Sequence, residues 1–237
     1  KLYWKINSGA YAGVQGIPAA GDQFSFTFAA GVALGDIVSY YIVAQDNASS
    51  PNAASYPPGG AGFTANPPAC STPPSSPNTY LVTSALSGVV TVGTGGTYPS
   101  LTDAGGLFYA INHSILTGNL TATIISNLTE YGTNPLNQWT EEPGGSNFTL
   151  TIQPDGTTER IISGSISSGM IRFDGADRVR VDGRSGGVGR YLRFRNTYTG
   201  GGGTFQLLND ATYNTIRNCY IEGANSGYDL GGAVYFS

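Results

Sequence analysis

The sequence predicts an all-β protein whose C-terminal half winds as a solenoid. Residues 170–183 (MIRFDGADRVRVDG) and 204–223 (TFQLLNDATYNTIRNCYIEG) each contain two alternating strands around a short polar break, and each ends on a glycine. The alanines of the two breaks, Ala176 and Ala211, lie 35 residues apart. One such unit cannot bury its own apolar face, so the units must stack on one another as successive coils.

The composition agrees with this fold class. The chain has 237 residues, of which 35 are glycine and only 11% are charged, which favours short strands joined by turns and argues against a helical bundle. No apolar run approaches the ~20 residues that a membrane span needs. The net charge is −4, with the arginines gathered between residues 160 and 217. Nucleic acid is therefore not an expected partner, because phosphate binding depends on a broad positive surface.

The first 67 residues have the pattern of a β-sandwich. Residues 2–6, 24–28 and 37–44 alternate in polarity between Gly, Asp and Asn turns. These strands are too few to close a sandwich, so we expect the chain to be a piece of a longer polypeptide. The stretch GDIVSYYIVAQDNA (35–48) resembles the late strands of fibronectin-III-like and immunoglobulin-like (Ig-like) modules of bacterial surface proteins. We assign residues 1–67 to the C-terminal part of such a module.

Residues 68–79 are rich in proline, which predicts an extended, semi-rigid linker. The second domain, 80–237, is expected to be the C-terminally incomplete start of a β-helix. In it, Ser100 and Asp103 have the spacing of a capping box, and a helical face of apolar residues follows. Such an amphipathic helix would cover the open strand edges and apolar core of the first coil.

Within the second domain, TVGTGGTYPSLTDA, SNFTLTIQPDGTTERIISG, GADRVRVDG and NDATYNTIRNCYIEG resemble right-handed parallel β-helices of the pectin-lyase-like type. More narrowly, they resemble the β-helix of large secreted surface proteins of gliding and biofilm-forming bacteria that use the type IX export route. The resemblance implies a right-handed β-helix with an N-terminal capping helix, located extracellularly or at the cell surface.

The alternation also predicts which side chains face water. With Phe173, Val181 and Phe194 in the core, the intervening arginines point outward. Because stacked coils lie about 4.8 Å apart, we expect these arginines to form one striped face beside three aspartates. Trp139, in a polar stretch, is either packed in place or free to stack on a sugar ring. The candidate binding residues are Trp139, Arg172, Arg180, Arg193 and Arg195.

Three carboxylates, Asp174, Asp177 and Asp182, have the residue types of the calcium site in lyases of this fold. Turns use the same Asp-Gly steps, and we favour that interpretation. We therefore assign no metal, cofactor or catalytic residue, with Ca²⁺ as the one ion that these side chains suggest. Cys70 and Cys219 fit no metal spacing. We expect a buried Cys219 and an exposed Cys70 whose partner, if any, lies outside this sequence, with a disulfide between the two as the alternative.

These observations predict a structural or adhesive segment of a large extracellular bacterial surface protein or fibre. Its expected partners are surface glycans or other protein copies, including copies of itself. The alternatives are a polysaccharide lyase or hydrolase whose active coils lie beyond residue 237, and a carbohydrate-binding module. A lyase would bring several carboxylates and an arginine together in one groove.

Overall fold

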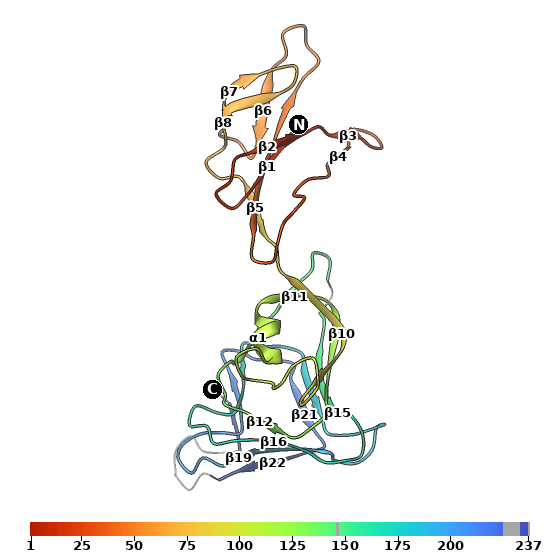
Figure 1. The fold of residues 1–237 in the computed structure, drawn as a ribbon, viewed down its shortest axis with the longest axis vertical. Coiled ribbons are helices and arrows are strands. Elements are labelled where there is room, and N and C mark those ends of the chain that lie inside the picture. Colours follow the sequence, from red (N-terminus) through yellow and green to blue (C-terminus); the bar gives the residue numbers. More distant parts are fainter. Residues whose placement is uncertain (146, 225–232, 237) are drawn as a thin grey trace. The chain divides into compact units, whose positions relative to one another are not determined.

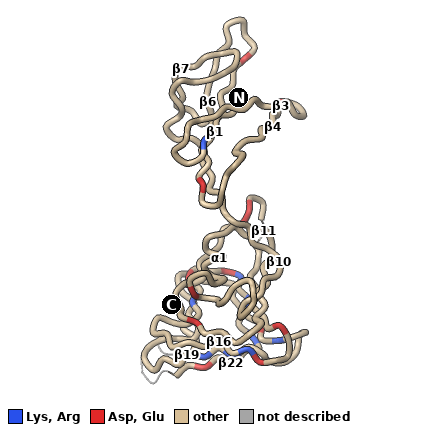
Figure 2. Tube along the Cα trace, viewed as in Figure 1, with Lys and Arg blue, Asp and Glu red and all other residues tan. Residues whose placement is uncertain are grey.

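The computed structural model describes residues 1–145, 147–224 and 233–236 and divides the chain into two compact units (Figure 1). The first unit is Lys1–Thr83 and the second is Ser84–Ser237. Both are built from β-strands, and the described part of the second also contains one short helix. Among the described residues, no helix has the length and apolar character to cross a membrane. Most charged residues belong to the second unit (Figure 2).

The first unit is organised around a five-stranded antiparallel sheet in the order β2-β1-β5-β6, with β9 pairing the other end of the long strand β5. Val38, Tyr41 and Val43 of β5 are buried. Two separate antiparallel pairs, β3-β4 and β7-β8, complete the unit. The strands are β1 (Leu2–Ile6), β2 (Ala12–Val14), β3 (Ile17–Pro18), β4 (Phe24–Ser25), β5 (Ile37–Gln45), β6 (Ala53–Tyr56), β7 (Ala61–Thr64), β8 (Ala69–Thr72) and β9 (Asn78–Leu81).

The boundary between the units differs from the expected linker at 68–79. Residues 69–72 pair with β7, and residues 78–81, which we had divided between the linker and the second domain, pair with β5. The division falls after Thr83 instead. Neither strand contains a proline. Because proline cannot donate to a strand ladder, the prolines of this stretch lie in the connections between strands.

The second unit is a β-solenoid of about five turns. Three parallel sheets form its sides: β10-β11-β15-β18-β21, β12-β16-β19-β22 and β13-β17-β20-β23, with β14 beside β11. The strands are β10 (Ser84–Val92), β11 (Ser114–Ile124), β12 (Leu128–Thr129), β13 (Leu136–Asn137), β14 (Thr140–Glu141), β15 (Leu150–Pro154), β16 (Arg160–Gly164), β17 (Ile171–Asp174), β18 (Val179–Asp182), β19 (Leu192–Asn196), β20 (Phe205–Leu208), β21 (Thr215–Arg217), β22 (Cys219–Gly223) and β23 (Val234–Phe236).

The two similar segments of the sequence stack as predicted. Ile171 pairs with Phe205 in one sheet, and Val181 pairs with Ile216 in another, both in parallel register. The polar break around Ala176 is the corner that carries the chain from the first of these sheets to the second. One repeat therefore supplies a strand to two different sides of the solenoid.

The core prediction is confirmed. Phe173, Val181 and Phe194 are each 0% exposed, and all three belong to one apolar cluster that fills the solenoid. Their rings meet across the interior: Phe173 lies 6.1 Å from Phe205, which lies 4.7 Å from Phe194. Both contacts are edge-on, the first between neighbouring rungs and the second within one rung, and they strengthen the packing beyond the area that they bury.

The helix α1 (Leu107–Asn112) is shorter than the sequence pattern suggested. The Oγ of Ser100 accepts the backbone N–H of Asp103 at 3.1 Å, as the capping-box spacing predicts, but residues 100–106 form turns. Gly105, with φ +79°, is incompatible with a continuous right-handed helix. Leu107, Phe108 and Ile111 are buried, and the ring of Phe108 lies 6.5 Å from that of Phe173.

Asparagine side chains tie neighbouring rungs together, at the corners for Asn127, Asn196 and Asn214 and within β11 for Asn119. In each case the amide oxygen accepts a backbone N–H from the neighbouring rung, which satisfies a donor that no sheet ladder reaches. Asn218 has φ +52°, which confirms that it occupies a left-handed bend. The ties run from Thr149 to Asn119 at 2.9 Å, from Ile161 to Asn127 at 2.9 Å, from Ile166 to Asn196 at 2.9 Å and from Val179 to Asn214 at 2.8 Å.

One buried carboxylate fixes the turns before α1. Glu130 is 1% exposed and accepts the backbone N–H groups of Leu101 and Thr102, both at 2.8 Å, and the hydroxyl of Thr102 at 2.5 Å. Burial raises the pKa of Glu130, and these three hydrogen bonds oppose the rise. A carboxylate without such donors would be too costly to bury here.

We expect Phe173→Ala to lower the free energy of unfolding of the second unit by about 3–5 kcal/mol, because it leaves a cavity between two other aromatic rings. Arg180→Ala, an exposed change on the next strand, should cost less than about 0.5 kcal/mol. Urea unfolding followed by near-ultraviolet circular dichroism measures both. Equal costs for the two variants would contradict the core described above.

Candidate functional site

The four predicted binding arginines do not form one striped face, so that part of the prediction is wrong. Arg172 lies on β17, Arg180 on β18, and Arg193 and Arg195 on β19. These strands belong to three different sheets of the solenoid. Each corner between consecutive strands redirects the chain, so alternation along the sequence continues on a different side of the molecule.

Arg193 and Arg195 instead tie three stacked strands together. Arg193 binds Glu159, next to β16, through Nε at 2.9 Å, and it also pairs with Glu222 of β22. Arg195 binds the same Glu222 at 2.5 Å, and the guanidinium of Arg193 lies 4.3 Å from the centre of the Tyr220 ring. Hydrogen bonds from these arginines lower the pKa of Glu159 and of Glu222. The cluster is internally paired, which favours a structural role.

The other two arginines are separate from this cluster. Arg180 is exposed. Arg172 is half-buried, and its Nη2 donates to the carbonyl oxygen of Gly132 at 2.8 Å. Its Nε is buried without a hydrogen-bond partner in the part of the chain that the structure describes.

The three aspartates that the sequence suggested as calcium ligands do not converge. Asp174 accepts the amide N–H of Asn209 at 2.5 Å, and Asp177 accepts the N–H and hydroxyl of Thr212 at 2.7 and 2.6 Å. Asp182 is bound by two arginines, described below. Within residues 1–145, 147–224 and 233–236, no three His, Cys, Asp or Glu side chains form a metal-binding group. The Asp-Gly steps act as turns and ties.

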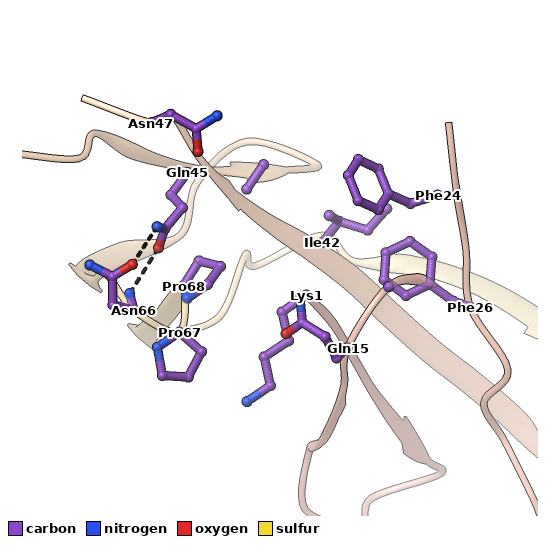
Figure 3. Close-up of a pocket in the computed structure, with 12 residues that line it drawn as sticks. Lys1, Gln15, Phe24, Phe26, Ile42, Gln45, Asn47, Asn66, Pro67 and Pro68 are labelled. Carbon is purple, nitrogen blue, oxygen red and sulfur yellow. Dashed lines mark hydrogen bonds between the residues drawn. The ribbon is translucent and has the colours of Figure 1, made fainter. Parts of the chain in front are cut away.

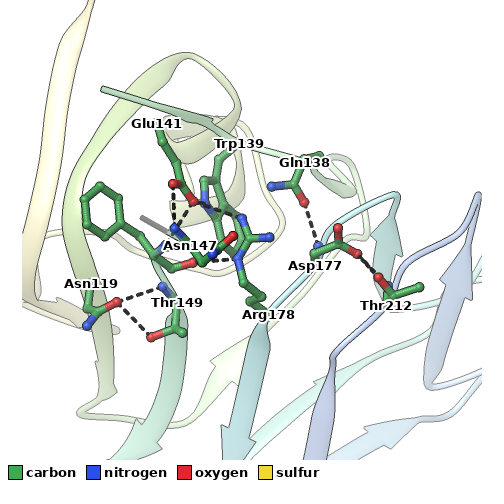
Figure 4. Close-up of polar contacts among 10 residues, drawn as sticks. Asn119, Gln138, Trp139, Glu141, Asn147, Thr149, Asp177, Arg178 and Thr212 are labelled. Atoms are coloured by element: carbon green, nitrogen blue, oxygen red, sulfur yellow. Dashed lines mark hydrogen bonds and ion pairs between the residues drawn. The ribbon is translucent and has the colours of Figure 1, made fainter. Parts of the chain in front are cut away.

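Trp139 is buried rather than available in a loop. It is 4% exposed and belongs to the solenoid core, so of the two alternatives for its ring the structure shows packing, and its place among the candidate binding residues is wrong. Its Nε1 donates to Glu141 at 3.3 Å, and the guanidinium of Arg178 lies 5.7 Å from its ring centre (Figure 4). The polar neighbours that suggested a loop point outward while the ring turns inward.

The first unit contains a groove that the sequence did not reveal. It has a volume of about 630 Å³ and is lined by Phe24, Phe26 and Ile42, with Pro67 and Pro68 opposite (Figure 3). The alternating phenylalanines of residues 24–28 were the one sequence signal for this groove. Alternation alone does not show which face of a strand stays uncovered in the folded unit. The remaining lining residues are Lys1, Gln15, Gly16, Ala44, Gln45, Asn47 and Asn66.

Polar groups border this groove on one side. The side-chain amide of Gln45 donates to Asn66 Oδ1 at 2.7 Å, and its Oε1 accepts the backbone N–H of Asn66 at 2.8 Å. Phe24 is 59% exposed at the other side. An apolar wall beside fixed amide groups is the usual composition of a site for a small, partly polar ligand, and the volume lies in the usual range.

The cysteines and the single histidine form no reactive group. Both cysteines are free thiols. Burial raises the pKa of Cys219 to about 12, so this thiol stays protonated and unreactive at neutral pH. His113 stacks on Tyr109, with 4.2 Å between ring centres, and its Nδ1 bonds the Tyr109 carbonyl oxygen at 2.8 Å.

Comparisons of this chain with protein-family models, curated proteins and solved structures found no match. Support for a function therefore comes from the residues and their geometry.

Asp182 allows a test of the rung-to-rung ties. Arg184 binds it through two hydrogen bonds of 2.9 Å, and Arg217 of the next rung binds it at 2.6 Å. These hydrogen bonds, that of Arg184 first, hold the pKa of Asp182 well below its ordinary value of 3.8. A lowered folded-state pKa stabilises the fold above the unfolded pKa, and this stabilisation is lost as the pH falls through the folded pKa.

We expect Asp182→Asn to lower the free energy of unfolding of the solenoid by about 1–3 kcal/mol at pH 7. The deficit should shrink as the pH is lowered below about 4, because the unfolded wild-type chain then takes up a proton at Asp182 that the folded chain binds only at lower pH. Urea unfolding at both pH values measures this difference. Asp210→Asn, at an exposed position, serves as the control. A deficit that is the same at both pH values would rule out the charged tie.

Proposed function

We propose that this chain is a structural and adhesive segment of a large extracellular bacterial surface protein. The solenoid is a rigid support of the right-handed, pectin-lyase-like kind, and the first unit is an Ig-like or fibronectin-III-like module that contacts surface glycans. The resemblances in the sequence support the location and the module types, and the contacts below support the two roles.

The observation that carries the structural role is how the solenoid uses its charged side chains. Arginines bind carboxylates of neighbouring rungs, as Arg193 does with Glu159 and Glu222, and as Arg217 does with Asp182. The asparagine ties act between the same rungs. A repeated, local set of bonds of this kind resists separation of the rungs along the whole axis, which suits a stalk.

In this proposal the helix α1 is the cap of the solenoid. Its buried face joins the core at the first rungs, through Phe108 against Phe173, and α1 packs on β11 and β13. A helix here covers apolar side chains that would otherwise face water. It also shields strand edges from pairing with other chains.

The groove of the first unit supports the adhesive role. Its phenylalanine and proline walls suit the apolar faces of sugar rings, and the Gln45 and Asn66 amides suit hydroxyl groups. The same groove favours a carbohydrate-binding module as the second candidate function, without catalysis.

A lyase or hydrolase would need carboxylates that are available to a substrate. Asp155, Asp182 and Glu222 of the solenoid are poor candidates because arginines already bind them.

We expect Phe24→Ala to weaken binding of the full chain to an immobilised polysaccharide about five- to tenfold, because it removes an exposed wall of the groove. Biolayer interferometry on cellulose, chitin, xylan and alginate surfaces measures this effect. Leu34→Ala removes a comparably exposed apolar side chain outside the groove and should leave binding unchanged. If wild type binds none of these surfaces, or if both variants bind alike, the adhesive role of the groove is wrong.

A further inference from the structure

A second hollow lies on the solenoid, away from the arginine clusters that bind its rungs together. It has a volume of about 350 Å³ and is lined by Asn147, Arg178 and Tyr213. These residues lie just before β15, β18 and β21, which are neighbouring strands of one sheet. Three successive rungs therefore each contribute one side chain at the same corner of the solenoid.

The backbone at this corner is unusual in the same way on all three rungs. Asn147, Arg178 and Tyr213 have φ of +54°, +62° and +56°. Asparagine tolerates this left-handed conformation, but arginine and tyrosine rarely adopt it. Bulky residues held in this conformation concentrate at functional sites, where the surrounding structure maintains them.

Neighbouring side chains and backbone groups hold this conformation. The N–H of Asn147 donates to Glu141 at 3.0 Å, and that of Arg178 donates to the Thr212 carbonyl oxygen at 3.1 Å. Asp177, next to Arg178, donates its N–H to Gln138 and accepts two hydrogen bonds from Thr212 (Figure 4). The corner is thus built before any ligand arrives, which reduces the entropy cost of binding.

The guanidinium of Arg178 is fixed and its charge is balanced. Its Nε donates to the Phe148 carbonyl oxygen at 3.1 Å, and its Nη2 binds Glu141 at 2.9 Å (Figure 4). Its third nitrogen, Nη1, has no hydrogen-bond partner among the described residues. Because Glu141 neutralises the guanidinium, the hollow offers a directed N–H donor without attracting an anion strongly.

Tyr213 supplies an apolar surface beside this donor. It is 85% exposed, the largest exposed fraction among the large hydrophobic residues described. A tyrosine ring presents a flat apolar face and a hydroxyl group, and both can contact an amphipathic ligand. The side-chain amide of the exposed Asn147, two rungs before that of Tyr213, adds a hydrogen-bond donor and an acceptor.

We propose that this corner binds two consecutive uncharged pyranose units of a glycan. The apolar face of one sugar lies on the Tyr213 ring, and hydroxyls of the pair bond Arg178 Nη1 and the Asn147 amide. Rungs about 4.8 Å apart place the three side chains over a span of roughly 10 Å, the length of about two sugar rings. This inference rests on the proposed adhesive function and assigns that function a second site, on the solenoid.

The test is an NMR titration of the isotope-labelled full chain with cellohexaose, xylohexaose and mannohexaose, with hexagalacturonate as the acidic comparison. We expect at least one neutral probe to shift the amides of Asn147, Arg178 and Tyr213. Tyr213→Asn removes the ring and keeps a residue that tolerates the backbone; it should weaken binding about fivefold or more. Tyr213→Phe should stay within about twofold. Tyr131→Asn, exposed at another corner, is the matched control.

Three results would overturn the inference: no neutral probe shifts these amides, Tyr213→Asn binds like wild type, or hexagalacturonate binds more tightly than every neutral probe. Unchanged amide shifts elsewhere in the solenoid show that Tyr213→Asn is folded. The Phe24→Ala experiment separates the two proposals. If Phe24→Ala and Leu34→Ala bind alike while a neutral probe still shifts the amides at the Tyr213 corner, only the groove is rejected. If Phe24→Ala weakens adhesion while no neutral probe shifts those amides, only the corner is rejected.

Discussion

The stacking of rungs is the constraint on which the second unit depends. A single turn has a row of apolar side chains and unpaired backbone groups on both edges, and only the turns above and below can bury and pair them. Phe173 shows this directly, since Phe108 and Phe205 contact its ring from two sides. The side-chain ties and the corner geometry follow from keeping these turns in register.

Polar residues at the corners make this register unique. Parallel ladders pair strands wherever the apolar pattern permits, so further contacts are needed to exclude slipped alternatives. The amide of Asn196 bonds the backbone of Ile166 on the neighbouring rung and the carbonyl oxygen of Gly203 on its own rung. Buried Glu130 accepts hydrogen bonds from three donors. Such groups are costly to bury unless every bond forms, so they penalise any other arrangement.

The two proposed contact sites differ in how the fold makes them. The groove of the first unit lies beside a sheet and combines apolar walls with an amide pair. The solenoid corner instead combines side chains from three rungs that are distant in sequence, held by left-handed backbone. A repetitive support can therefore carry a local binding site without interrupting its stacked core, because corners tolerate variation that strands do not.

The sequence by itself determined the all-β class, the stacked rungs and the inward side chains, because period-two alternation and a repeat length depend only on residue order. It also predicted the left-handed bend at Asn218, which reflects a property of asparagine itself. The tertiary structure alone decided which side of the solenoid each strand occupies. Arg172, Arg180 and Arg193 look equivalent in the sequence, yet corners place them on three sheets. The same holds for buried Trp139 and for the corner of Asn147, Arg178 and Tyr213, because the direction of the chain after each bend is set by packing between rungs.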